Sequence, residues 1–147
     1  MIIKMYSVFA RETLKLMKFE GKLAAQAQHA TLHAWWDAED RLKYDRLKTD
    51  SGRPIKVLSA YYQDVMHPYK YLGDARKITL VVDTVDELRE LYKQFRPHMG
   101  VTLVEDCAYT VFEESTVTAV GLGPIPSDWT KGTRLADLPT LGNEIQK

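Results

Sequence analysis

Between Gly21 and Trp36, the hydrophobic and polar positions separate into two neighbouring stripes when they are placed at about 100° per residue. One stripe is polar and consists of Lys22, Gln26, His29 and His33. The other consists of small or apolar residues, namely Leu23, Ala27, Ala30 and Ala34. Small residues are typical of a helix that lies close against a sheet or another helix. The pattern therefore predicts a packed helix whose polar row either carries a functional site or simply faces water.

Four shorter segments have the residue types of β-strands. They are residues 2–10, 77–82, 101–105 and 116–121, with 11–20 and 106–115 as connecting loops. The helix that begins at Gly21 is expected to pass Trp36 and to continue or restart until about residue 47, because helix breakers follow at 50–54. Thr84 and Glu87 have the spacing of a capping box, so a second helix is expected from there to Pro97.

This order of elements predicts both the fold class and the domain organisation. The fold class is α/β, a single three-layer domain in which a mixed four-stranded β-sheet carries helices on both faces. The segment Gly121-Leu122-Gly123-Pro124 is expected to close the sheet region. We expect residues 1–147 to form this one domain, with an insertion at about 53–76 and a partly ordered C-terminal tail from about residue 125.

The insertion and the tail give weaker signals than the rest of the chain. The insertion holds four tyrosines but follows neither the strand period nor the helix period, so its shape is left open. Its tyrosines either pack the segment or, together with interleaved basic residues, stack on nucleic-acid bases. In the tail, Trp129 is expected to anchor the segment to the domain, and the last few residues are expected to fray.

Composition restricts the class of protein further. With 147 residues, 45% hydrophobic and 27% charged, the chain has the size of one well-packed domain. The single cysteine, Cys107, cannot form an internal disulfide, and no apolar run has the length of a signal core or membrane span, so we expect a cytoplasmic protein. Formal net charge is zero, and nucleic-acid binding would therefore need a local basic patch. Candidates for that patch are Lys15, Lys18, Lys22, Lys56, Lys70, Arg76 and Lys77.

Three segments together resemble a known family. The first is Ala10-Arg11 with the run Gly21-Lys22-Leu23-Ala24-Ala25-Gln26-Ala27-Gln28-His29-Ala30-Thr31. The second is Ile78-Thr79-Leu80-Val81-Val82-Asp83 with Asp86-Glu87-Leu88. The third is Val104-Glu105-Asp106-Cys107-Ala108-Tyr109-Thr110 with Ser115-Thr116-Val117-Thr118-Ala119-Val120-Gly121-Leu122-Gly123-Pro124. In order and spacing they resemble the peptidyl-tRNA hydrolases of the archaeal and eukaryotic type, over roughly residues 5–36 and 77–124.

This resemblance implies an activity, a partner and a set of site residues. The activity is hydrolysis of the ester that joins a peptide to the terminal ribose of tRNA, so the partner is peptidyl-tRNA. Neither a metal nor an organic cofactor is implied. The residues assigned to catalysis are Lys22, Asp106 and Thr118, and those assigned to substrate binding are Arg11, Gln26, His29, Thr110 and Thr116. We expect Lys22, Gln26, Asp106, Thr110 and Thr118 to converge on one surface cleft.

The residue types at these positions suit ester hydrolysis without reference to the family. The reaction needs a positioned water, a group that accepts its proton, and donors aimed at the developing oxyanion. Asp106, at a strand end, has the chemistry of the proton acceptor. Lys22, in the first turn of a helix, places a positive charge where backbone N–H groups add to the same field. Thr116 and Thr118 lie two apart on a strand and project to the same side.

Other interpretations stay open from the sequence alone. A non-catalytic RNA- or protein-binding module on the same fold would fit Ala108 and Tyr109, which stand where the family pattern has glycine and arginine, and would also fit the neutral charge. A metal hydrolase could use His29 and His33, but the glutamate of H-E-x-x-H and a third ligand are missing from the sequence. His29 also fits a hydrogen-bonded structural role. A homodimer is a further open possibility.

Overall fold

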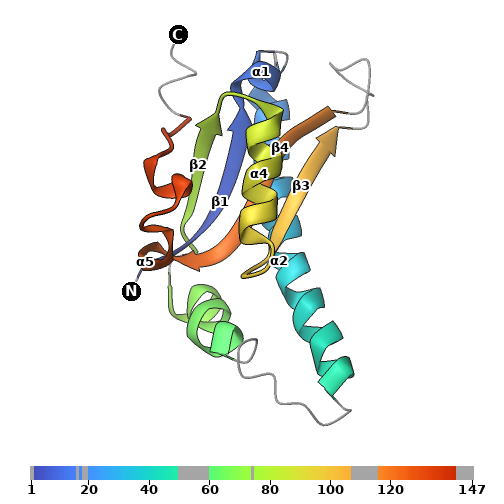
Figure 1. Cartoon of the computed structure of the whole chain (residues 1–147), viewed down its shortest axis with the longest axis vertical. Helices are drawn as coiled ribbons and strands as arrows, with labels where there is room; N and C mark the ends of the chain where they lie inside the picture. The colour runs from blue at the N-terminus through green and yellow to red at the C-terminus, as the bar shows by residue number, and fades with distance from the viewer. Residues whose placement is uncertain are drawn as a thin grey trace.

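A four-stranded sheet organises the chain, and the helices that connect its strands lie on both of its faces (Figure 1). The computed structural model describes residues 2–15, 17, 20–49, 60–73, 75–106 and 116–141, with only the backbone at 20, 43–49 and 106. The elements in chain order are β1 (Ile3–Ala10), α1 (Arg11–Leu14), α2 (Glu20–Thr49), η1 (Tyr62–Met66), η2 (Pro68–Leu72), β2 (Lys77–Val82), α4 (Val85–Phe95), β3 (Val101–Asp106), β4 (Thr116–Pro126), α5 (Ser127–Thr130) and η3 (Arg134–Asp137).

The strands are ordered β2-β1-β4-β3. The β1–β2 pair is parallel, and the β1–β4 and β3–β4 pairs are antiparallel, so the sheet is mixed. Parallel strands need a crossover, and the long helix α2 supplies most of it on one face. Helix α4 covers the opposite face between β2 and β3 (Figure 1). The α/β fold with a mixed four-stranded sheet that the sequence predicts is therefore confirmed.

The small-residue stripe of α2 is the surface on which the helix meets the sheet, as predicted. Ala30 and Ala34 are fully buried. A Cβ atom added to Gly121 in β4 would lie only 1.8 Å from the carbonyl oxygen of Ala30. One added to Gly100, just before β3, would lie 2.2 Å from that of Ala34. The backbones of α2 and the sheet thus approach so closely that both sheet positions require glycine.

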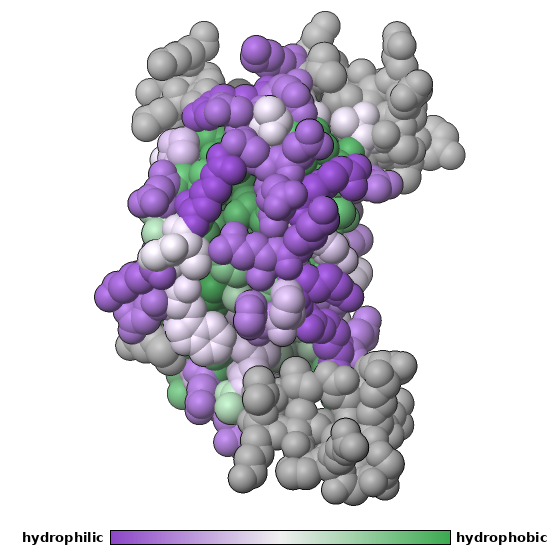
Figure 2. Space-filling view, viewed as in Figure 1, coloured by the Kyte–Doolittle hydropathy of each residue, from purple (hydrophilic) through white to green (hydrophobic). Residues whose placement is uncertain are grey.

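Helix α4 is amphipathic and packs on the other face through Leu88, Leu91 and Phe95. Its predicted capping box is present, with the Glu87 N–H donating to the Thr84 hydroxyl and the Glu87 carboxylate accepting from the Thr84 N–H. The hydrogen bond from Arg134 is the main cause that holds the pKa of the Glu87 carboxyl below its usual range. The outer face over α4 is mainly hydrophilic (Figure 2).

Several predicted boundaries differ from the structure. Residues 11–14 form the short helix α1 rather than a loop, and the Thr13 hydroxyl donates to the Ala10 carbonyl at 3.0 Å. Helix α2 is continuous to Thr49. Strand β4 does not end near Gly121 but continues to Pro126, because the Gly123 N–H donates to the Gly100 carbonyl at 3.0 Å. Gly123 has φ +117°, which glycine adopts without steric cost.

The part of the insertion that the structure describes is helical. Its segments η1 and η2 are wound with i→i+5 hydrogen bonds, which explains why neither the strand period nor the α-helical period runs through it. Tyr61 and Tyr69 are buried, and the Tyr61 hydroxyl donates to the Pro124 carbonyl at 2.7 Å. Burial raises the pKa of the Tyr61 hydroxyl. Tyr62 and Tyr71 remain exposed. None of the described helices combines the length and the apolar content that a bilayer crossing requires.

The C-terminal segment lies against β2. The Val81 N–H donates to the Pro139 carbonyl and the Leu141 N–H donates to the Thr79 carbonyl, each at 3.0 Å. Leu135 and Leu141 are buried, whereas Trp129 is 48% exposed. The Trp129 ring lies 6.4 Å from the ring of the buried Tyr61, so Trp129 makes one contact with the domain, while the leucines and the backbone hydrogen bonds fix the rest of the segment.

The close approach of α2 to β4 yields a test of the fold. Gly121→Ala should lower the free energy of unfolding by about 3 kcal/mol, because the new methyl group would overlap backbone atoms of Ala30. Gly21→Ala is the control, since nothing lies within 4 Å of a Cβ atom there and alanine favours the helix by up to about 1 kcal/mol. Chemical denaturation of both variants measures the difference. Equal stability of the two would contradict the close packing.

Candidate active site

The predicted site residues fall at one end of the sheet, where β1 and β3 end and β4 begins. The register pairs Phe9 with Ala119 and Asp106 with Thr116. Helix α2 begins at the same end, next to α1 (Figure 1). Residues separated by about eighty positions in the sequence are thereby brought to one edge of the molecule.

A buried hydrogen bond at this end joins α2 to β4. The Thr118 hydroxyl donates to the Gln26 side-chain oxygen at 3.0 Å and lies 3.4 Å from the Val104 carbonyl. Thr118 is 0% exposed and Gln26 is 5% exposed. The bond uses the Gln26 side-chain oxygen as an acceptor and so fixes the orientation of the amide. Two of the predicted site residues thus form a buried polar pair.

A β-bulge aims Thr118 at α2. In the β3–β4 register, Val104 pairs with Ala119 and Glu105 pairs with Val117, so Thr118 has no partner on β3. Ala119 packs in the hydrophobic cluster beneath α2, whereas Val117 packs in the cluster that includes the α4 leucines. Thr118 and Ala119 therefore face the same helix, although they are adjacent in the strand. The sequence analysis missed this bulge.

Asp106 and Thr116 face each other across the β3–β4 ladder, at the very end of the pair. Thr116 is half-buried, and strand alternation places it on the same face as Thr118. Thr110, together with Cys107, Ala108 and Tyr109, lies outside the described residues.

Lys22 lies in the first turn of α2 and is half-buried, one turn before Gln26. The N–H groups of the first turn and the dipole of this 30-residue helix place positive potential at the same point. His29 lies one turn beyond Gln26 and is exposed, with its ring centroid 5.6 Å from that of His33. The arrangement combines a cation, helix N–H donors and an amide beside the strand that ends at Asp106.

Arg11 belongs to the same end of the sheet but is directed away from this group. Its guanidinium pairs with Asp83, which follows β2, at 2.6 Å. The neighbouring Glu12 carboxylate accepts a hydrogen bond from the Val85 N–H at 2.6 Å. Since β1 separates β2 from β4, the structure does not bring Arg11 to Thr118.

The basic residues do not form one patch. Lys15 and Lys22 lie near the site, whereas Lys77 opens β2 opposite Met5, at the far end of the sheet. Lys70 and Arg76, which precede Lys77 in the chain, belong to that far end as well. Lys18 and Lys56 lie outside the described residues.

The described residues hold no metal-binding cluster, and one cavity of the structure lies away from this end. Within the described ranges, no group of three or more histidine, cysteine, aspartate or glutamate side chains is placed to hold a metal ion. A cavity of about 760 Å³ lies at the opposite end of the sheet, where Tyr61, Gly100 and Trp129 contribute to its lining. It is remote from Thr118 and Asp106, which belong to the other ends of β4 and β3.

Comparison with known proteins assigns this arrangement to a family. The family model "Peptidyl-tRNA hydrolase PTH2" matches residues 3–133. The chain belongs to the peptidyl-tRNA hydrolase PTH2 family. The match includes every predicted site residue, both the α2 residues and those of β3, β4 and the loop between them. The resemblance that the sequence motifs predict is therefore confirmed.

Curated archaeal members of the family are similar to the chain over most of its length. The peptidyl-tRNA hydrolase of Thermoplasma acidophilum is 30% identical over 125 residues, which are 84% of this chain and 86% of the relative. That of Aeropyrum pernix is 32% identical over 126 residues, or 85% and 83%. That of Methanococcus maripaludis is 29% identical over 119 residues, or 80% and 83%.

The buried pair yields a test that is independent of catalysis. Thr118→Val should lower the free energy of unfolding by about 1–3 kcal/mol, because the buried Gln26 oxygen loses its donor. Thr118→Ser keeps the hydroxyl and should cost only about 1 kcal/mol for the lost methyl group. Thermal or chemical unfolding compares the two variants. A valine variant as stable as the serine variant would contradict the importance of the hydrogen bond.

Proposed function

We propose that this protein hydrolyses the ester bond of peptidyl-tRNA and releases free peptide and tRNA. The observation that carries the proposal is the buried Thr118–Gln26 pair, which joins the start of α2 to the strand end beside Asp106 in a member of this family. Curated relatives that match more than four fifths of the chain carry the same activity in their names. The chain is thus assigned to the hydrolases.

In the proposed reaction, Asp106 accepts a proton from a water molecule, and the water oxygen attacks the ester carbonyl carbon. The negative charge that develops on the carbonyl oxygen is stabilised by the Lys22 ammonium and by the positive end of the α2 dipole. Collapse of the tetrahedral intermediate expels the ribose hydroxyl, which takes the proton back from Asp106. The peptide leaves as a carboxylic acid, and no metal or organic cofactor takes part.

Thr118 and Gln26 have a supporting role in this scheme. Because Thr118 is fully buried, we assign it to positioning rather than to direct contact with the substrate. Its hydroxyl fixes the Gln26 amide, and the amide NH₂ group is proposed to donate to the substrate. Thr116 and Thr110 are proposed to hold the terminal ribose, and His29 is proposed to contact the tRNA. Arg11, tied to Asp83, is proposed to act from the rim of the site.

The setting of the protein follows from the proposed substrate. Peptidyl-tRNA arises where translation occurs, so we place the protein in the cytoplasm, which also suits a chain with the single cysteine Cys107. Whether the protein forms a homodimer is a separate matter that light scattering at several protein concentrations would decide.

Asp106→Asn tests the catalytic assignment. The amide keeps the shape of the side chain but cannot accept the proton, so turnover of peptidyl-tRNA should fall by about 100-fold or more while tRNA affinity changes little. Lys22→Ala should lower both affinity and turnover. Lys70→Ala is the control, because this lysine lies at the far end of the sheet. Release of intact tRNA from purified peptidyl-tRNA measures turnover.

A fully active Asp106→Asn variant would refute the assignment of the base. If the natural protein binds tRNA but releases no peptide above background, the assignment of hydrolase activity is refuted. The chain is then interpreted as a non-catalytic RNA-binding module.

The dependence of tRNA affinity on salt concentration tests which lysine side chains contact the tRNA phosphates. Each phosphate contact contributes about −0.7 to −0.9 to the slope of log affinity against log salt concentration. Lys22→Ala should therefore reduce the steepness of the slope by about that amount, and Lys70→Ala should leave the slope unchanged. Filter binding of deacylated tRNA over a salt series gives both values. A slope near zero for the natural protein would exclude phosphate contacts.

A further inference from the structure

Three ring-bearing side chains continue the polar stripe of α2 beyond Gln26. They are His29, His33 and Trp36, and we call them the ring row. The His33 and Trp36 rings are stacked, with centroids 5.2 Å apart and planes at 23°, and the His29 and His33 centroids are 5.6 Å apart. All three side chains are exposed, and Trp36 is 50% exposed. A continuous aromatic surface therefore begins one turn beyond the proposed site.

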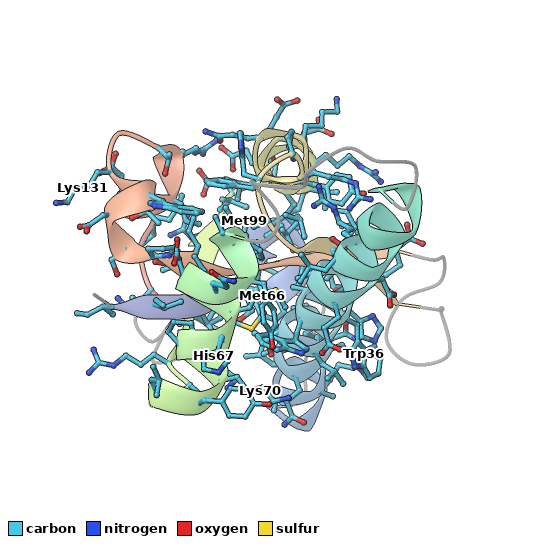
Figure 3. The ribbon with its side chains drawn as sticks, turned by 90° about the horizontal axis from the view of Figure 1, so that it is seen from below. Trp36, Met66, His67, Lys70, Met99 and Lys131 are labelled. Atoms are coloured by element: carbon cyan, nitrogen blue, oxygen red, sulfur yellow. The ribbon has the colours of Figure 1, made fainter. Side chains whose placement is uncertain are left out.

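The ring row runs beside β3, the edge strand that leads to Asp106. Trp36 is followed by Asp37, whose carboxylate accepts a hydrogen bond from the Val101 N–H, at the first residue of β3, at 3.0 Å. One turn before the row, Gln26 contacts Thr118, whose hydroxyl lies 3.4 Å from the Val104 carbonyl near the end of β3. Trp36 lies on the side of α2 away from His67 and Lys70 (Figure 3). The insertion helices η1 and η2 therefore leave Trp36 uncovered.

The dimensions of this surface fit a short single strand. Lys22 and Trp36 are fourteen positions apart in one helix, which corresponds to about 21 Å. Beyond Trp36 the stripe meets the carboxylate of Asp40, which is exposed and repels phosphate. Arg96, which is 42% exposed, pairs with Asp37 at 3.3 Å beside that end, so this ion pair adds no net charge there. The surface thus has a cation, Lys22, at the end next to the proposed site, followed by the rings.

From this arrangement we infer that the ring row binds the unpaired 3′ end of tRNA by stacking on its bases. The inference rests on the proposed function, since that end of tRNA carries the peptide ester. Bases stack on aromatic side chains without regard to sequence, so the row can hold a single strand without base-specific contacts. A strand laid along α2 from Trp36 toward Lys22 would deliver its terminal ribose to the side of Asp106.

The test compares two RNAs and two tryptophans. The RNAs are deacylated tRNA and the same tRNA trimmed of its unpaired 3′ nucleotides. Trp36→Ala should weaken binding of intact tRNA by about tenfold, as expected for one lost base stack, and should leave binding of trimmed tRNA unchanged. Trp129→Ala is the matched control, because Trp129 is 48% exposed and lies at the opposite end of β4 from the site. It should bind both RNAs like the natural protein.

Two further variants separate stacking from structural damage. Trp36→Phe keeps a flat ring and should retain most of the affinity for intact tRNA, whereas His33→Ala should lose part of it. Thermal unfolding of each variant verifies that the fold is intact, and an unfolded Trp36→Ala variant would leave Trp36→Phe and His33→Ala to decide. Quenching of tryptophan fluorescence by intact but not by trimmed tRNA should occur in the natural protein and disappear in Trp36→Ala.

Several results would overturn the inference. Equal loss of affinity for both RNAs, or no loss for either, would exclude contact with the 3′ end. A change of oligomeric state in Trp36→Ala, measured by light scattering, would assign the row to an interface between two copies. An effect that appears only with a peptide attached would assign it to the peptide. Binding is measured with deacylated tRNA, which has no ester to hydrolyse. A failure of base stacking on the ring row can therefore be distinguished from a failure of hydrolysis.

Discussion

The contact between Ala30 of α2 and Gly121 of β4 sets the geometry of the whole site end. It brings a helix backbone against a strand backbone with no side chain between them. Gln26 lies one helical turn before Ala30, and Thr118 lies three residues before Gly121, so the same approach places their side chains within hydrogen-bond distance. A bulkier residue at either contact would push the helix outward and separate the pair. Packing and chemistry therefore share one constraint.

The bulge at Thr118 turns its side chain toward α2, so that it can bond to Gln26. In a regular strand, Ala119 and Gly121 would face α2 and Thr118 would face the opposite side. The Thr118 hydroxyl would then point into the apolar cluster beneath α4. The extra residue of the bulge reverses the alternation of side chains between the two faces. The Thr118 hydroxyl therefore meets the Gln26 oxygen rather than leucine side chains. A buried polar pair whose partners are satisfied adds specificity to the core, because any other register would leave both groups unpaired.

The features that could be predicted from the sequence were those set by local pattern. The small-residue stripe of α2 and the order of strands and helices along the chain follow from hydrophobic periodicity. The capping box of Thr84 and Glu87 follows from the spacing of those two residues. The C-terminal end of β4 could not be predicted, because Gly121 and Gly123 are typical of a turn. They belong to the strand only through their contacts with Gly100 and α2. The bulge did leave a sequence signal, since Val117, Val120 and Leu122 change their spacing from three to two. The π-type winding of residues 62–72 left no pattern that strand or α-helix templates detect.

The backbone bonds between the C-terminal segment and β2 have a consequence for the behaviour of the protein at high concentration. Thr140 forms an antiparallel bridge with Leu80, so the outer edge of β2 is occupied by the chain's own residues. A free strand edge is a template on which another molecule can add its own strand, and a sheet with two free edges can extend without limit. Because residues 139–141 occupy the middle of β2, they oppose the addition of another molecule's strand at this edge of the sheet.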